Sequence, residues 1–248
     1  MSRLAKRPIA VPAKTEVSYS GGSVMVKGPK GTLQKVGHRL INIEVGAEGV
    51  QVSTKSETIE ARSAAAADLQ RATGATLIHP YDDDRVIAGQ GTAALEFLEE
   101  IPDLDMICAP VSGGGLLSGT AIAAKSLRPE IQVIGCEPAN ADDAARSLAS
   151  GQIEPPAQAL TMADGLRATL CARTFAILRE RVDRILLVSE GEIVRSMHLI
   201  TEHLRCSVEP SGAVAAAPAL HRQLVGEDLR VGIILSGGNF DASEFRES

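Results

Sequence analysis

"PVSGGGLLSG", residues 110–119, lies between a short apolar run and an alanine-rich segment. The run from Met106 to Val111 predicts a buried strand, and the segment from about Leu116 to Leu127 predicts a helix. Glycines between a strand and a helix let backbone amides converge on an anion, and the amino end of the helix adds a partial positive charge. The stretch therefore predicts either a phosphate-binding loop or a tight turn without a ligand.

The loop departs from two common nucleotide-binding patterns. No Gly-Lys-Ser or Gly-Lys-Thr follows the glycines, so the stretch is not a Walker A loop. The glycines are not spaced as GxGxxG, yet Glu137 lies about 20 residues beyond them, where a dinucleotide-binding unit places an acidic residue for the ribose. At this point a dinucleotide stays open as a ligand.

From about Thr58 onward, the chain alternates between helical patterns and short apolar runs. Buried apolar strands that alternate with helices are typical of a parallel sheet covered by helices on both faces. We therefore predict an α/β fold with a doubly wound, mostly parallel sheet over residues 57–248. The expected strands span 75–79, 105–111, 131–136, 184–188 and 230–235, and the expected helices span 60–71, 86–100, 116–127, 142–150, 174–182, a segment after Ser189, and 212–225.

The first 56 residues differ from the rest in composition. They hold nine Lys or Arg against three Glu, whereas the whole chain has a net charge of −6. Six of the seven lysines lie in this segment. Short alternating runs, separated by glycine turns at 21–22, 28–31 and 46–49, predict a small β-rich segment. We therefore predict two domains, residues 1–56 and residues 57–248.

Composition also suggests a cellular compartment. No apolar run is long enough to cross a membrane, and the amino terminus lacks the apolar core of a signal peptide. The four cysteines are widely spaced without a CxxC pair, which fits buried thiols in a reducing environment. We therefore expect a cytoplasmic protein that does not associate with membranes.

Further polar motifs follow the other predicted strands. Ligands of open α/β sheets bind at the carboxyl ends of the strands, so we expect these motifs to gather around the glycine loop. They are "GCEPANADDA" (135–144), "TMADGL" (161–166), "VEPSGAVA" (208–215) and "LSGGN" (235–239).

Together with "HPYDDDRVIAGQGTAALEF" (79–97), these motifs resemble, in order and spacing, the fold-type II pyridoxal-phosphate enzymes of the threonine/serine dehydratase and serine racemase branch. The resemblance covers about 190 residues, from roughly Ile59 to the carboxyl terminus. It implies pyridoxal phosphate as the cofactor. It also implies dehydration of L-threonine or L-serine, or racemisation of serine, and a homodimer as one assembly.

The resemblance assigns cofactor contacts to residues of these motifs. The Ser236 hydroxyl would form a hydrogen bond with the pyridine nitrogen of the cofactor. A neutral hydroxyl at that position suits elimination better than transamination. Gly165 would lie beside the cofactor through its backbone, and Glu209 would lie near the ring. The loop backbone that would hold the cofactor phosphate consists of Ser112, Gly113, Gly114, Gly115 and Leu116.

A divalent cation site is the second assignment that the resemblance implies. Its ligands would be the carboxylates of Glu137 and Asp143 and the carbonyl of Ala141. An all-oxygen set of this kind suits Mg²⁺ or Ca²⁺. The alternative is that these carboxylates only cap the amino end of a helix, without a metal.

One expected part of the family's chemistry is missing. The family uses a lysine near its amino terminus to form a Schiff base with the cofactor, and its Ser-x-Lys-x-Arg-Gly-like motif is absent here. Only Lys125 lies in the matching region, about 15 Å along the helix from the glycine loop at 1.5 Å per residue. We interpret Lys125 as a solvated helix lysine and assign no catalytic residue. Weak or absent activity is therefore expected.

The amino-terminal segment has a resemblance of its own. "MSRLAKRPIAVP" and "VMVKGPKGTL" resemble the start of the bacterial ribosomal protein L6 family over about 50 residues. Lys27, Lys30 and Lys35 could meet RNA phosphates by charge alone, although the segment lacks an aromatic stacking platform. The alternative function is therefore a non-catalytic remnant that binds cofactor and cation, or a chimera with an rRNA-binding segment joined near residues 53–58.

Other polar residues are weaker candidates. Arg167 and Arg173 flank the "TMADGL" loop and could attract a carboxylate. The three successive aspartates at 82–84 could bind a cation, but we interpret them as a solvated turn. His198 and His203 are five residues apart, a poor spacing for zinc, and are interpreted as structural.

Overall fold

The computed structural model describes residues 8–37, 41–54, 59–156, 160–221, 223–224, 226 and 228–239. The chain divides into two compact units between Leu77 and Ile78, and each is considered by itself. The predicted domain boundary at residues 56–57 lies outside the described residues. Helix α1 (Ile59–Thr73), predicted over 60–71, groups with the first unit.

Short strands form most of the first unit, as predicted, and the structure shows that they pair antiparallel. Gly21 and Gly22, with φ of +55° and +77°, make the turn between the first two strands, a conformation that glycine adopts without strain. One sheet contains β1 (Glu16–Ser20), β2 (Ser23–Gly28) and β3 (Gly31–Val36), and a hairpin contains β4 (Ile41–Gly46) and β5 (Gly49–Thr54).

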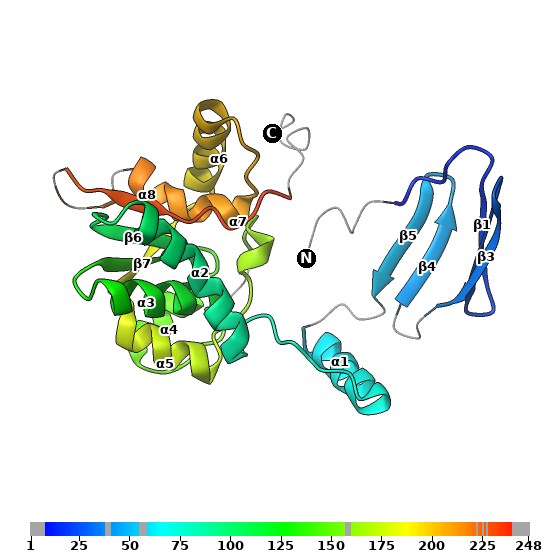
Figure 1. Ribbon diagram of the computed structural model, residues 1–248, viewed down its shortest axis with the longest axis horizontal. Helices are drawn as coiled ribbons and strands as arrows, with labels where there is room; N and C mark the ends of the chain where they lie inside the picture. The colour runs from blue at the N-terminus through cyan, green and yellow to red at the C-terminus, as the bar shows by residue number, and fades with distance from the viewer. Residues whose placement is uncertain are drawn as a thin grey trace. The chain divides into compact units, whose positions relative to one another are not determined.

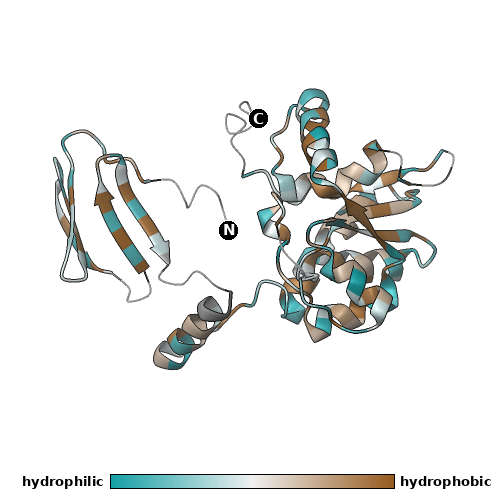
Figure 2. Cartoon of the chain, turned by 180° about the vertical axis from the view of Figure 1, so that it is seen from behind, coloured by the Kyte–Doolittle hydropathy of each residue, from teal (hydrophilic) through white to brown (hydrophobic). Residues whose placement is uncertain are grey.

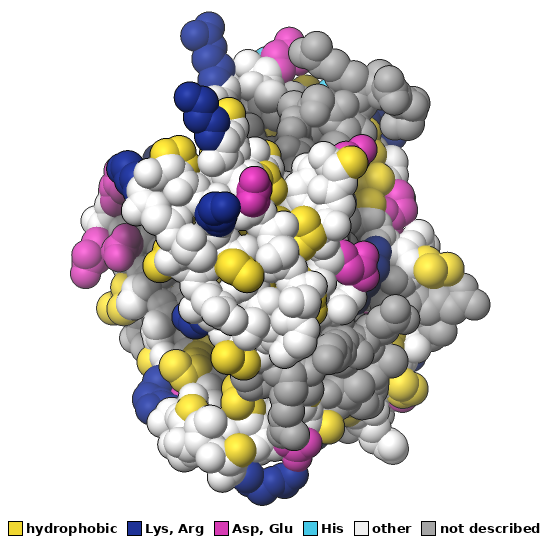
Figure 3. Space-filling model, turned by 90° about the vertical axis from the view of Figure 1, so that its right-hand side faces the viewer, with side chains coloured by type: hydrophobic (Ala, Val, Ile, Leu, Met, Phe, Trp, Pro, Cys, Tyr) yellow, Lys and Arg dark blue, Asp and Glu magenta, His cyan; other side chains and the backbone are white. Residues whose placement is uncertain are grey.

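These strands expose much of their apolar surface. Hydrophobic and hydrophilic bands alternate along β4 and β5 (Figure 2). Every residue of β3 is exposed, and Leu33 and Val36 keep 78% and 76% of their surface in water. On the face shown in Figure 3, hydrophobic side chains are scattered among polar and charged ones and do not join into one patch.

The predicted strand over residues 75–79 is wrong. These residues have no regular secondary structure, and Ile78 is 68% exposed. Gly74, with φ of +69°, ends α1 in the left-handed conformation, and the Nδ1 atom of His79 accepts the amide of Asp82 at 2.9 Å. A short apolar run predicts a strand only when a neighbouring strand is available to pair with it, and the structure describes none here.

The second unit is built on a four-stranded parallel sheet in the order β8-β7-β6-β9, which confirms the predicted α/β class. Figure 1 shows helices on both faces of this sheet. The strands are β6 (Met106–Pro110), β7 (Gln132–Pro138), β8 (Arg184–Val188) and β9 (Val231–Ile233). One face carries α6 (Glu190–Leu204), α7 (Pro210–Ala213) and α8 (Ala217–Leu220), and the other carries α2 (Asp84–Glu100), α3 (Gly115–Leu127), α4 (Asp143–Ser150) and α5 (Ala172–Arg181).

Side-chain alternation along the strands divides the core into two clusters. Met106 and Cys108 of β6 pack in the cluster that also contains residues of α6. Ile107 and Ala109 point to the opposite face and pack in the cluster with residues of α2, α3 and α5. Because both faces of each strand are buried, these strands read as continuous apolar runs rather than alternating ones.

Two elements near the carboxyl terminus are shorter than predicted. The helix expected over 212–225 consists of three short helical pieces between Pro210 and Leu220. The strand expected over 230–235 covers only Val231–Ile233, because it pairs with three residues of β6. No described helix is both long and apolar enough to cross a membrane.

Glycines bring α2 and α3 into close contact. A Cβ atom on Gly119 would lie 2.3 Å from the Ile87 carbonyl oxygen, and a Cβ on Gly91 would lie 2.9 Å from the Gly119 carbonyl oxygen. Neither backbone could approach so closely with a side chain between them. This contact fixes α3, and with it the glycine loop that leads into the helix.

Candidate functional site

The glycine loop joins the carboxyl end of β6 to the amino end of α3, as the sequence predicted. Gly114, with φ of +85°, is the residue before the helix, and a Cβ there would lie 2.8 Å from Thr174 and Leu170 atoms. Within the described residues, the amides of Gly113 through Leu116 donate no hydrogen bond. Unpaired amides at a helix amino end form a binding site for an anion.

Tyr81 forms one wall of this loop, a contact that sequence reasoning missed. A Cβ on Gly113 would lie 2.4 Å from the Tyr81 ring, and a Cβ on Gly115 would lie 2.8 Å from the tyrosine Cβ. His79 holds the ring edge-on, with the two ring centroids 4.6 Å apart. Burial of the phenol raises the pKa of Tyr81. The sequence offered two signals: Tyr81 is one of two tyrosines, and it lies within the motif 79–97 that takes part in the family resemblance.

Two hydroxyl groups fix the other side of the loop. The Thr174 hydroxyl, at the start of α5, donates to the Gly113 carbonyl at 2.8 Å. The Ser112 hydroxyl accepts the amide of Ala168 at 3.1 Å. Both contacts join residues about 60 positions apart in the chain, so local sequence patterns could not reveal Thr174.

Further contacts link the remaining predicted cofactor residues. The Ser211 hydroxyl accepts the amide of Gly165 at 3.0 Å. The Glu209 amide donates to the Gly237 carbonyl at 3.0 Å, and the glutamate side chain lies against Gly237, where a Cβ would be 2.3 Å from its Oε1. Ser236, next to Gly237, is exposed. The structure therefore connects "TMADGL", "EPSGAV" and "LSGGN" by direct contacts.

The charged residues near the loop differ from prediction. Arg173 pairs with Asp82 at 2.8 Å and with Asp84, so the guanidinium is not free for a substrate carboxylate. Asp83 caps α2 by accepting the Arg85 amide, so the aspartates are not merely a solvated turn. Arg167 donates to the Thr161 carbonyl. Both arginines thus have structural partners.

Glu137 and Asp143 lie buried at the end of β7 and the start of α4. The Glu137 carboxylate accepts the amides of Ala144 and Ala145 at 3.0 and 2.9 Å, so it caps α4. Burial raises the pKa of Glu137 to about 8 and that of Asp143 to about 6. The Oδ2 atom of Asp143 is buried without a hydrogen-bond partner in the described residues.

A bound cation would give the Asp143 Oδ2 atom a partner, but the carboxylates of Glu137 and Asp143 alone provide too few ligands for a cation site. Among the described residues, no group of three or more His, Cys, Asp or Glu side chains is placed so that it could hold a metal ion. The backbone carbonyl of Ala141, a residue that is 2% exposed, would have to serve as a third ligand. Capping of α4 and binding of a cation are compatible, because Asp143 Oδ2 is free of the cap.

Lys125 is not the solvated lysine that we expected. It lies in the last turn of α3, and its ammonium pairs with Asp183 at 2.8 Å, with the lysine side chain 18% exposed. Asp183 precedes the amino end of β8, whereas the glycine loop follows the carboxyl end of β6. Parallel strands place these two points at opposite edges of the sheet, which supports the inference that Lys125 does not reach the loop.

A model of the family described as "Pyridoxal-phosphate dependent enzyme" matches residues 24–237. The chain belongs to this pyridoxal-phosphate-dependent enzyme family. Serine racemase of Arabidopsis thaliana is 43% identical over 205 residues, which cover 81% of this chain and 62% of that protein. β-Hydroxyaspartate dehydratase of Paracoccus denitrificans is 45% identical over 175 residues, which cover 71% of this chain and 56% of that protein.

Solved structures agree with this membership. The structure of maize serine racemase has a TM-score of 0.73 and 42% identity, and the match covers 77% of this chain and 59% of that one. The chain therefore spans about three fifths of the length of the relatives it matches. Membership in a pyridoxal-phosphate-dependent enzyme family favours that cofactor over the dinucleotide that the loop alone left open.

The described residues fit the phosphate of this cofactor. Four consecutive loop amides, from Gly113 to Leu116, have no acceptor in the described part of the chain, and they lie at the amino end of α3. Tyr81 and Thr174 hold the loop backbone in place on either side, so the amides are already oriented before an anion binds. Preorganised donors of this kind bind an anion without a further ordering cost.

Proposed function

We propose that this chain binds pyridoxal phosphate at the glycine loop, as the cofactor-binding part of a serine racemase or hydroxy-amino-acid dehydratase. The unpaired amides of Gly113 through Leu116 carry this proposal. Four further residues complete the set: Ser112 anchors the loop, Gly165 and Glu209 line the site, and Ser236 would bond the ring nitrogen. The relatives named serine racemase and β-hydroxyaspartate dehydratase support this class of substrate.

The lysines of the chain indicate that it turns over little substrate by itself. Bound pyridoxal phosphate supplies an electron sink for the bonds at the α-carbon of an amino acid. The reaction also needs a lysine at the cofactor to move the α-proton. Lys125 is the only lysine of residues 57–248, and it is bound to Asp183. We therefore expect weak or no activity toward L-serine and L-threonine.

A divalent cation is part of the same proposal. Mg²⁺ or Ca²⁺ would be held by Glu137, Asp143 and the Ala141 carbonyl. The buried, unpartnered Oδ2 of Asp143 supports this assignment. Because α4 begins at Asp143, a bound cation would stiffen the turn between β7 and that helix.

Titration with pyridoxal phosphate tests the loop assignment through one backbone amide. Leu116→Pro removes the N–H of Leu116 in the first turn of α3, where helices tolerate proline. Leu116→Ala keeps that amide and removes only the side chain. Loss of one charge-assisted hydrogen bond should weaken binding by about tenfold or more in the proline variant alone.

Two outcomes would contradict the proposal. Equal affinity in the proline and alanine variants would show that the loop amides do not hold the phosphate. Rapid formation of 2-oxo acid from L-serine or L-threonine, or of D-serine, would contradict the expected weak activity. Borohydride reduction of the loaded protein, followed by peptide mass mapping, would then identify which lysine reaches the cofactor.

A further inference from the structure

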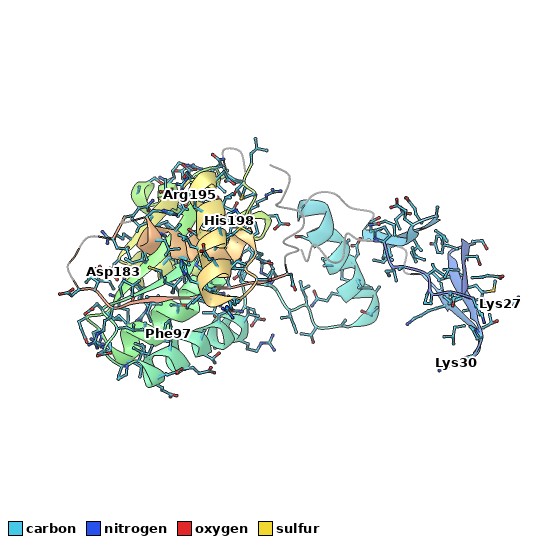
Figure 4. All side chains as sticks on the ribbon, turned by 90° about the horizontal axis from the view of Figure 1, so that it is seen from above. Lys27, Lys30, Phe97, Asp183, Arg195 and His198 are labelled. Atoms are coloured by element: carbon cyan, nitrogen blue, oxygen red, sulfur yellow. The ribbon has the colours of Figure 1, made fainter. Side chains whose placement is uncertain are left out.

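A cavity of about 260 Å³ lies away from the glycine loop, between α4, α5 and the amino end of β8. Asp183, at its rim, lies near the outer edge of the second unit (Figure 4). Since the sheet is parallel, this end of β8 and the carboxyl end of β6 are at opposite edges, roughly 15–20 Å apart for strands of five residues. The cavity is therefore separate from the proposed cofactor site.

Two arginines that have no carboxylate partner among the described residues mark this cavity. Arg179 and Arg184 both line it, and neither pairs with a carboxylate among the described residues. Asp183 also lines the cavity, but it already has two partners, the ammonium of Lys125 at 2.8 Å and the amide of Val133 at 2.7 Å. The guanidinium of Arg179 lies over the Phe175 ring, 5.5 Å from its centroid, and no carboxylate in the described residues pairs with either arginine.

Arg184 shows this imbalance most clearly. Its Nε atom is shielded from solvent and has no hydrogen-bond acceptor in the described part of the chain. A buried donor without a partner costs about 1–3 kcal/mol, and more when the group is charged. A guanidinium can satisfy two donors at once with a planar carboxylate.

The other walls of the cavity are apolar. Leu148 of α4, together with Val182 and Ile185 around the start of β8, lines it. Leu148 and Ile185 also pack against the core cluster, so these walls are held in place. The volume suits a molecule of a few heavy atoms and is below the usual size of nucleotide and drug sites.

We propose that this cavity, the Arg179–Arg184 pocket, binds a small aliphatic carboxylate. The two guanidinium groups bind the carboxylate, and the Leu148–Ile185 side holds a short hydrocarbon chain. An inorganic phosphate would satisfy the arginines but would leave the apolar walls without a partner. The pocket should therefore bind a carboxylate that carries a short hydrocarbon chain more tightly than inorganic phosphate.

Arginine labelling tests the pocket in the whole chain. Phenylglyoxal modifies accessible arginines, and peptide mass mapping measures the modification of each one. Sodium butyrate should protect Arg179 and Arg184, while sodium phosphate at the same ionic strength protects them less. Arg181 is the internal control, since it pairs with Glu180 at 3.2 Å and does not line the cavity. Protection that persists in Leu116→Pro places the butyrate away from the glycine loop.

Thermal unfolding in butyrate gives the second measurement. Wild-type protein should show a higher Tm in butyrate than in sodium chloride of equal ionic strength. Arg184→Met keeps the apolar stem and should raise the apparent Kd for butyrate about tenfold or more, whereas Arg181→Met should not change it. If Arg184→Met does not fold, the Tm response of Arg179→Met and the arginine labelling of the wild type test whether butyrate binds in the pocket.

Three results would overturn the proposal. Butyrate could fail to protect Arg179 and Arg184. Phosphate could protect them as well as or better than butyrate, which would indicate a site for bare oxyanions. Arg184→Met and Arg179→Met could both retain the full butyrate response. None of these results bears on pyridoxal phosphate binding, which the Leu116 variants measure separately.

Discussion

Gly113 and Tyr81 provide a test of how the loop is held, because the tyrosine ring occupies the space that a side chain at residue 113 would need. Gly113→Ala should destabilise the second unit by about 1–3 kcal/mol, the usual cost of overpacking. Tyr81→Ala in the same chain should recover most of that loss. Urea unfolding of both single variants and the double variant measures the coupling.

Gly89→Ala is the matched control for this pair. Gly89 is exposed within α2, and a Cβ there would meet nothing within 4 Å. Alanine should therefore stabilise the helix by about 0.5–1 kcal/mol. Additive effects of Gly113→Ala and Tyr81→Ala would show that the ring does not restrict the loop.

Asp143 and Glu137 lead to a prediction about metal. A cation that binds only the folded state raises its stability. MgCl₂ or CaCl₂ should therefore raise the Tm of the wild type above that in NaCl of equal ionic strength, and EDTA should reverse the gain. Glu137→Gln should abolish the response. Asp142→Asn should retain it, because Asp142 pairs with Arg146 at 2.9 Å. An equal response in Glu137→Gln would contradict the site.

At the scale of single elements, the amino end of α6 combines a capping box with a titrating group. The Ser189 hydroxyl accepts the Glu192 amide, and the Glu192 carboxylate accepts the Ser189 amide at 2.9 Å. Ser189→Ala should lower the free energy of unfolding by about 1 kcal/mol.

The hydrogen bond from Ser189 lowers the pKa of Glu192. The ionised carboxylate therefore stabilises the fold above its ordinary pKa, and this contribution is lost as the pH falls through the lowered value.

Glu192→Gln separates charge from hydrogen bonding at this cap. The amide oxygen still accepts the Ser189 amide, but the group no longer titrates. The free energy of unfolding, measured from pH 4 to pH 7, should therefore depend less steeply on pH in this variant below about pH 5. A slope that matches the wild type would show that Glu192 does not contribute to the acid response.

The same cap illustrates what sequence could predict about elements. Ser189 and Glu192 stand three residues apart before an apolar pattern, so the start of α6 is encoded locally. The run 75–79 has a local strand pattern too, but a strand needs a partner, and its exposed Leu77 and Ile78 have none in the described sheets. Pairing is a long-range property that the pattern does not contain.

At the scale of the whole molecule, the candidate site gathers four segments at one edge of the sheet. The glycine loop was recognisable locally as a candidate anion site, whereas Ser112, Gly165 and Glu209 were named as cofactor contacts through the resemblance of their motifs to a known family. Sequence reasoning missed Tyr81 and Thr174, whose role is to fix the loop backbone from distant positions. Residues that position a site, rather than contact its ligand, have ordinary side chains and become recognisable only through the fold.

Every cofactor residue that we propose lies in the second unit, which begins at Ile78. A chain of residues 78–248 should therefore bind pyridoxal phosphate with an affinity within about twofold of the full chain, since the contacts from Ser112 to Gly237 are all internal to that unit. Circular dichroism first establishes that the shortened chain is folded, and absorbance titration then gives its affinity. Leu116→Pro in the shortened chain is the negative control. A folded shortened chain that has lost binding would mean that residues 1–77 contribute to the site, and the assignment of the cofactor to the second unit alone would be wrong.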